Sequence, residues 1–113
     1  MVLAKFSQLS LLALALASPA LACVQFDLSI NSQTGIVNAA LIDNGGQKCS
    51  ITNKNVVWNP STQSLSCVAG YSANFDRNTG VVTYQYGTFD GSFGTTVHPG
   101  SPLTYWTASV WGC

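Results

Sequence analysis

Few side chains in this sequence could carry acid–base catalysis. His98 is the single histidine, and imidazole is the side chain that changes its charge near neutral pH without a special environment. It precedes Pro99 in an expected loop, a common position for active residues. The chain has no glutamate and one arginine, Arg77. The spacing of its few ionisable residues reveals neither a general acid paired with a general base nor two facing carboxylates. We therefore assign no catalytic residue.

Aromatic rings offer a second chemistry, because they stack on sugar rings while nearby amides and hydroxyls bond sugar hydroxyls. The chain has three tryptophans and four tyrosines among many Asn, Thr and Ser residues. If residues 103–111 form one regular strand, Tyr105 and Trp111 share one face and Trp106 points to the other. Most rings are expected to fill the core, and an exposed one would mark a binding surface. The candidates for exposure and ligand contact are, in order, Trp58 and Trp106, with Tyr105 beside them.

Four cysteines define the expected cross-links: Cys23, Cys49, Cys67 and Cys113. There is no Cys-x-x-Cys pair and His98 lies far from every cysteine in sequence, so we expect no metal, no redox dithiol and no cofactor. An even number in a short chain predicts two disulfides, with three possible connectivities. We favour Cys49–Cys67 with Cys23–Cys113. The first disulfide would close a short loop and the second a long one. Chain-entropy estimates give a stabilisation of roughly 3 kcal/mol for the first and about 4.5 kcal/mol for the second.

The first 22 residues have the pattern of a secretory signal peptide. Lys5 is their single charge, an apolar stretch covers residues 11–17, and Ala20 and Ala22 stand where signal peptidase reads. The apolar stretch is short for a membrane span of about 30 Å, and a lipidated Cys23 is a second alternative. We expect cleavage after Ala22 and a secreted, extracellular domain at residues 23–113.

Charge is scarce in this expected domain. Its ionisable side chains besides His98, the tyrosines and the cysteines are Asp27, Asp43, Asp76, Asp90, Lys48, Lys54 and Arg77. No basic face for phosphates can be built from so few cations, which argues against nucleic acid as a partner. Nothing favours a membrane surface either. The expected partner is an extracellular protein or a neutral glycan.

Strands and turns must position these residues. Residues 24–31 alternate apolar and polar without error, which is the period of a half-buried strand. No segment has the i, i+3, i+4, i+7 apolar stripe of a helix. We expect an all-β sandwich or small barrel, stapled by disulfides, with about seven to nine strands. The expected strands cover residues 24–31, 36–42, 48–52, 56–58, 64–67, 71–75, 81–86, 88–93 and 103–111, with a long loop at 95–102.

Two turn sequences repeat 45 residues apart. Asn31-x-x-Thr34-Gly35 matches Asp76-x-x-Thr79-Gly80, and two apolar residues follow each turn. One interpretation is a duplicated, double Greek-key fold. The alternative is that hairpin turns use the same few residues everywhere.

The second half contains Tyr84-x-x-x-x-Phe89-x-Gly91, a spacing that resembles the signature of βγ-crystallin-like domains, some of which are small secreted microbial proteins. The match covers eight residues. Ala39 and Asn44 stand in the first half where that family has aromatic residues, and its calcium-binding segment is absent, so the resemblance implies no calcium site.

The whole profile, from the expected cleavage site to Cys113, resembles small secreted fungal proteins with two disulfides, many of them candidate effectors. That resemblance implies an extracellular role and assigns no residue. The function we expect is extracellular recognition of the effector type, without catalysis. A lectin-like carbohydrate-binding module is the alternative, and a small secreted hydrolase such as a ribonuclease comes third.

Overall fold

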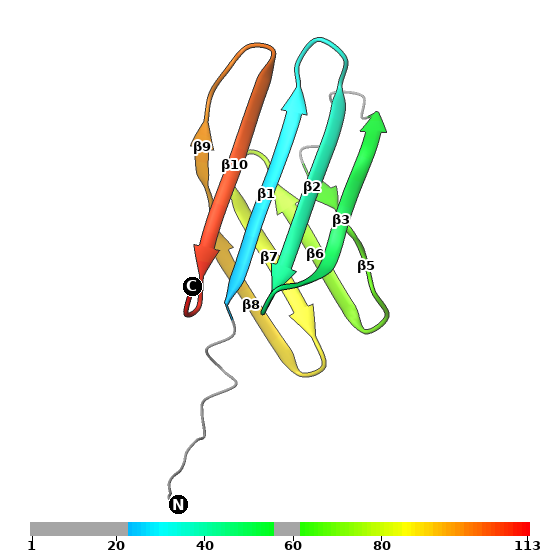
Figure 1. Cartoon of the computed structure of the whole chain (residues 1–113), viewed down its shortest axis with the longest axis vertical. Coiled ribbons are helices and arrows are strands. Elements are labelled where there is room, and N and C mark those ends of the chain that lie inside the picture. Colours follow the sequence, from blue (N-terminus) through cyan, green and yellow to red (C-terminus); the bar gives the residue numbers. More distant parts are fainter. Residues whose placement is uncertain (1–22, 56–61) are drawn as a thin grey trace, which may run out of the picture.

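A computed structural model gives the structure of residues 23–55 and 62–113. The leader expected at residues 1–22, the strand expected at 56–58 and Trp58 lie outside these described residues. All regular structure inside them is β-strand, as the sequence predicted (Figure 1). The strands are β1 (Val24–Asn31), β2 (Ile36–Asp43), β3 (Gly46–Asn55), β4 (Thr62–Ser64), β5 (Ser66–Cys67), β6 (Tyr71–Asp76), β7 (Val81–Tyr86), β8 (Phe89–Gly94), β9 (Thr96–His98) and β10 (Leu103–Val110).

The strands form two antiparallel sheets that pack face to face as a sandwich and do not close into a barrel. One sheet has six strands in the order β5-β3-β2-β1-β10-β9, and the other has four in the order β4-β6-β7-β8. Figure 1 shows the six-stranded sheet in front of the four-stranded one. The order β10-β1-β2-β3 is that of a Greek key. In the four-stranded sheet, β6, β7 and β8 form a meander and β4 pairs beside β6, so the described strands contain one Greek key and not two.

The segment after β8 differs from the sequence prediction. Residues 95–102 were expected to form one long loop, but Thr96–His98 is the short edge strand β9, which pairs with β10. Three residues are too few to show a period of two, so only the pairing partner defines this strand. The strand expected at 64–67 is likewise divided between the two sheets, as β4 and β5.

Alternation along the strands separates a buried face from an exposed one. In β1 the apolar residues at every second position are almost fully buried, while the residues between them are exposed or half-buried. The inward face of the six-stranded sheet is mainly aliphatic, because β1, β2 and β3 supply it with the side chains Val24, Leu28, Ile30, Val37, Leu41 and Ile51.

The inward face of the four-stranded sheet is mainly aromatic. Tyr71, Tyr86 and Phe89 lie directly opposite one another on β6, β7 and β8. Their ring centroids are 5.2 Å apart from Tyr71 to Tyr86 and 5.0 Å from Tyr86 to Phe89. Deeper in the core, Phe75 stacks on Phe26 of the other sheet at 5.8 Å. Ring contacts therefore join the two sheets.

A buried hydrogen bond also joins the sheets. The Tyr84 hydroxyl on β7 donates to Oδ2 of Asp43, at the end of β2, over 2.8 Å. Tyr84 has 0% of its surface exposed and Asp43 has 8%. Burial raises the pKa of the Tyr84 phenol far above its usual range, and the hydrogen bond and negative charge of Asp43 raise it further. The phenol therefore stays protonated and bonded in the folded protein.

The two repeated turn sequences form the same turn. In the β1–β2 hairpin, Asn31 Oδ1 accepts the amides of Gln33 and Thr34, and Thr34 Oγ1 accepts the amide of Ile36. Gly35 has a φ of 74°, a left-handed conformation that glycine adopts without strain. The β6–β7 hairpin repeats every one of these bonds 45 residues later, from Asp76 to Val81, with a φ of 73° at Gly80.

Both disulfides belong to the six-stranded sheet. Cys23 before β1 bonds Cys113 after β10, and Cys49 on β3 bonds Cys67, directly opposite it on β5. This is the pairing that the loop lengths favoured. Two disulfides are typical of extracellular proteins.

Candidate functional site

The outward face of the six-stranded sheet presents one exposed ring among polar side chains. Register places His98, Tyr105, Ser29 and Asn38 side by side on β9, β10, β1 and β2. Side chains directly opposite each other in antiparallel strands share one face of the sheet. Tyr105 has 45% of its surface exposed. The sequence predicted Tyr105 as a ligand contact, and its exposure is compatible with that role.

Contacts with β9 hold the Tyr105 ring in place. The Tyr105 and His98 rings stack with centroids 4.7 Å apart and an interplanar angle of 16°. His98 Nε2 lies 2.9 Å from Oγ1 of Thr107, the next residue on the same face of β10. The imidazole is therefore fixed by a ring on one side and a hydroxyl on the other.

Polar groups with free bonding capacity surround this ring. Asn38 Oδ1 accepts the amide of Asn53, which leaves the Asn38 side-chain NH₂ as a donor. Asp27 lies directly opposite Thr107 on β1, and within the described residues no hydrogen bond or ion pair engages its carboxylate. Partial burial raises the pKa of Asp27. We call the set Asp27, Ser29, Asn38, His98, Tyr105 and Thr107 the Tyr105 platform.

Trp106 is not an exposed aromatic, and that expectation from the sequence is wrong. It has 8% of its surface exposed, and its ring meets Phe75 edge-on at 5.3 Å in the core. Strand alternation places Tyr105 and Trp106 on opposite faces, and the sequence does not show which face is buried. Trp106 and Arg77 also border two small hollows, of about 70 and 250 Å³, near the β6–β7 turn.

A regular strand over 103–111 predicted that Trp111 shares the outward face with Tyr105. That prediction is wrong. Strand β10 ends at Val110, and Trp111 has a left-handed φ of 58° that ends the alternation. Its ring packs at 5.3 Å from Phe89 and 5.4 Å from Phe93. The third candidate, Trp58, lies outside the described residues.

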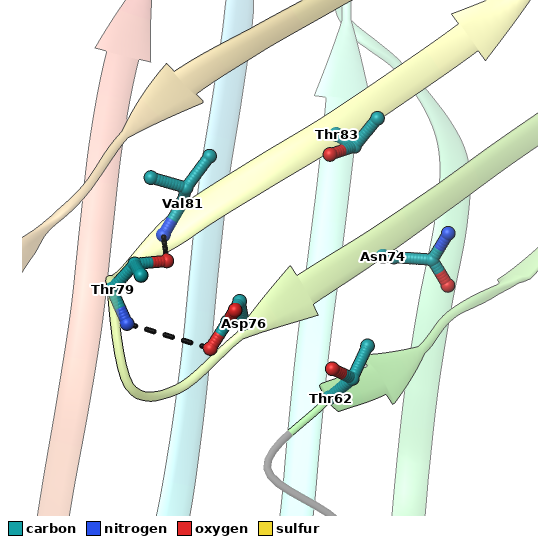
Figure 2. Close-up of a pocket in the computed structure, with 6 residues that line it drawn as sticks. All are labelled: Thr62, Asn74, Asp76, Thr79, Val81 and Thr83. Carbon is teal, nitrogen blue, oxygen red and sulfur yellow. Dashed lines mark hydrogen bonds between the residues drawn. The ribbon is translucent and has the colours of Figure 1, made fainter.

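A second polar surface lies on the outward face of the four-stranded sheet. Figure 2 shows a hollow whose side chains come from β4, β6, β7 and the β6–β7 turn. Its volume is about 350 Å³. We call it the Thr62 hollow, and its lining residues are Thr62, Asn74, Asp76, Thr79, Val81 and Thr83. The sequence analysis did not find it, because its members become neighbours only through strand pairing.

Nowhere in 23–55 or 62–113 do three or more His, Cys, Asp or Glu side chains gather where they could hold a metal ion. Within those ranges there is also no helix long and apolar enough to cross a membrane.

Comparison with protein-family models, with curated proteins and with solved structures finds no match. The resemblances to βγ-crystallin-like domains and to fungal secreted proteins therefore stay predictions. Locally, the shared spacing has a packing cause. Gly91 lies opposite Tyr84, and a Cβ on Gly91 would come within 2.7 Å of the Phe89 ring. The spacing thus provides a glycine beneath an aromatic ring.

Proposed function

We propose that this protein is a secreted extracellular recognition domain that binds a neutral carbohydrate through the Tyr105 platform, without catalysis. The observation that carries the proposal is the exposed Tyr105 ring, held by its stack on His98 and placed in one row with the polar residues Ser29 and Asn38. The two disulfides support the extracellular location, since such bonds persist in oxidising environments.

The chemistry of the platform suits a sugar. A pyranose ring has an apolar face that packs on an aromatic ring and hydroxyls around its rim that need donors and acceptors. Tyr105 supplies the aromatic surface, Asn38 supplies a donor, and Asp27 supplies an acceptor. A ring already packed against His98 also loses little rotamer freedom when a ligand binds, which favours affinity.

The charge of the platform favours a neutral sugar over an acidic one. Asp27 is its single carboxylate, and its raised pKa reflects crowding by neighbours and no compensating cation. A uronic acid or sulfated sugar would bring a second negative charge beside this carboxylate, and like charges in contact are unfavourable. We therefore expect binding to chitin, β-glucan or mannan and no binding to pectin or heparin.

The test is retention of the purified secreted protein on chitin, β-glucan and mannan resins, with Tyr105→Ala as the decisive variant. Losing a stacking ring worth about 1.5 kcal/mol lowers affinity roughly tenfold. Tyr105→Phe keeps the ring and should keep most of the affinity. Val68→Ala is a matched control, because Val68 is a comparably exposed apolar residue outside the platform. Wild-type protein that passes through all three resins, or Tyr105→Ala protein retained like wild type, would refute the proposal.

A further inference from the structure

We infer that the protein has a second carbohydrate-binding surface, the Thr62 hollow, and that it can therefore bridge two glycan chains. The inference rests on the proposed function, because it takes the ligand class from the Tyr105 platform. It adds a separate site with different chemistry on the opposite outward face of the sandwich.

The free bonding groups of the hollow are the first support. The Thr62 and Thr83 hydroxyls form no hydrogen bond to other described residues, and Figure 2 shows them with Asn74 on three neighbouring strands. Asn74 Oδ1 already accepts the Ser64 hydroxyl over 2.8 Å, so the Asn74 side-chain NH₂ remains as a donor. Donors and acceptors thus alternate across the hollow, as the hydroxyls of a sugar require.

The β6–β7 turn completes the hollow. Oδ1 of Asp76 is occupied by the turn amides of Asn78 and Thr79, which leaves Oδ2 as an acceptor. Thr79 Oγ1 accepts the amide of Val81, so its hydroxyl hydrogen is still available as a donor. These bonds fix both side chains before a ligand arrives, which lowers the entropy cost of binding.

The size of this open hollow agrees with a small ligand. A volume of about 350 Å³ lies at the lower end of the range for small-molecule sites, roughly 300–1,000 Å³. The described residues that line the hollow include no aromatic ring, so we expect hydrogen bonds from these side chains to hold a sugar there. Since such bonds replace bonds to water, each adds only about 1 kcal/mol, and we expect weaker binding than at the Tyr105 platform.

The placement of the two surfaces makes the protein bivalent. They are the outward faces of two sheets packed about 10 Å apart across a shared core, and each turns away from the other. One sugar unit cannot contact both. A polysaccharide bound to one face leaves the other free for a second chain, so long glycans should be cross-linked.

The test is calorimetric titration of the purified protein with hexasaccharides of chitin, β-glucan and mannan. We expect two inequivalent sites in the wild type. Tyr105→Ala should weaken the tighter one roughly tenfold and leave the weaker unchanged. The double variant Thr62→Val with Thr83→Val removes two hydroxyls without changing side-chain shape, and it should abolish the weaker site alone. Ser72→Ala is the matched control, because that outward hydroxyl on β6 already bonds Gln85.

A second readout is turbidity with the long polysaccharide whose hexamer binds. Wild type should cross-link it, and a variant of either face should not. A single site in the wild type, weakened in Tyr105→Ala, would overturn bivalence and leave the proposed function intact. A weaker site unchanged in the double threonine variant would overturn its assignment to the hollow. Absence of any wild-type binding would overturn both proposals.

Discussion

Both sheets of this sandwich bury aromatic rings, but they differ in what their outward faces present. The four-stranded sheet turns its rings inward, and its outward face carries hydroxyl, amide and carboxyl groups. The six-stranded sheet has a mainly aliphatic inward face, and its outward face exposes the ring of Tyr105. In the proposed function, Tyr105 binds a sugar by stacking, whereas the described lining residues of the Thr62 hollow bind it by hydrogen bonds.

The two sheets also differ in what holds them. Both disulfides lie in the six-stranded sheet, and the strands of the four-stranded sheet contain no cysteine. That sheet is attached through ring contacts such as Phe75 with Phe26, and through the bond from Tyr84 to Asp43. Removing a disulfide therefore tests the six-stranded sheet, and removing a core ring tests how the four-stranded sheet is attached.

The largest loss in the free energy of unfolding should come from removing a disulfide of the six-stranded sheet. Replacing Cys23 and Cys113 by serine opens a loop with a sequence separation of 90, against 18 for Cys49 and Cys67. Chain entropy predicts losses in the free energy of unfolding of about 4.5 and about 3 kcal/mol. Urea unfolding of the two double variants measures them. A larger loss on removing the disulfide of the shorter loop would show that these disulfides do not stabilise the fold mainly by constraining the unfolded chain.

The second experiment removes one aromatic ring from each sheet by substitution with alanine. Phe75→Ala removes a ring with 0% exposure that touches both Phe26 and Trp106, so we expect a loss of about 3–5 kcal/mol. Tyr105→Ala removes an exposed ring, and its loss should stay within about 0.5 kcal/mol. Urea midpoints at equal protein concentration compare them. Similar losses would mean that Tyr105 serves folding as much as Phe75 does.

A smaller effect than the loss of Phe75 concerns the polar link between the sheets. Tyr84→Phe keeps the ring but leaves the buried Asp43 carboxylate without its donor, which should cost about 1–3 kcal/mol at neutral pH. Thermal unfolding of the variant and the wild type at pH 7 measures this cost. An unchanged melting temperature would indicate that water replaces the phenol.

The same pair predicts a dependence on pH. The folded protein raises the pKa of Tyr84 above the ordinary value of about 10, so only the unfolded chain releases this proton as the pH rises past that value. Wild-type stability should be complete below about pH 10 and fall above it. Tyr84→Phe should lose less over the same range. Melting temperatures from pH 9 to pH 11.5 compare the two slopes, and parallel slopes would contradict the assignment to Tyr84.

Much of the fold was predictable because its signals are local. The alternation over residues 24–31 and the turn from Asp76 to Gly80 each depend on neighbours in sequence, and both appear as predicted. The 45-residue repeat also has a local cause. The two turns share their hydrogen bonds, yet they lie in different sheets with different strands beside them, so turn chemistry explains the match without a second Greek key.

The candidate site was less predictable, because it depends on which strands are neighbours. The sequence predicted Tyr105 as a ligand contact, but it did not single out Asp27, Ser29, Asn38 and Thr107, although each occupies a polar position of an alternating strand. Nothing in the sequence brings Asn38 to the same row as Tyr105, since two strand pairings intervene. The Thr62 hollow has the same origin.

The sequence by itself determined the class of fold, most strand positions and both hairpin turns, because period and turn chemistry act within short stretches. It favoured one disulfide pairing among three, and the structure has that pairing. Only the tertiary structure decided which side of each strand became core. A period of two gives two faces without naming the buried one, so Trp106 could be placed inward only once β10 lay across from Phe75.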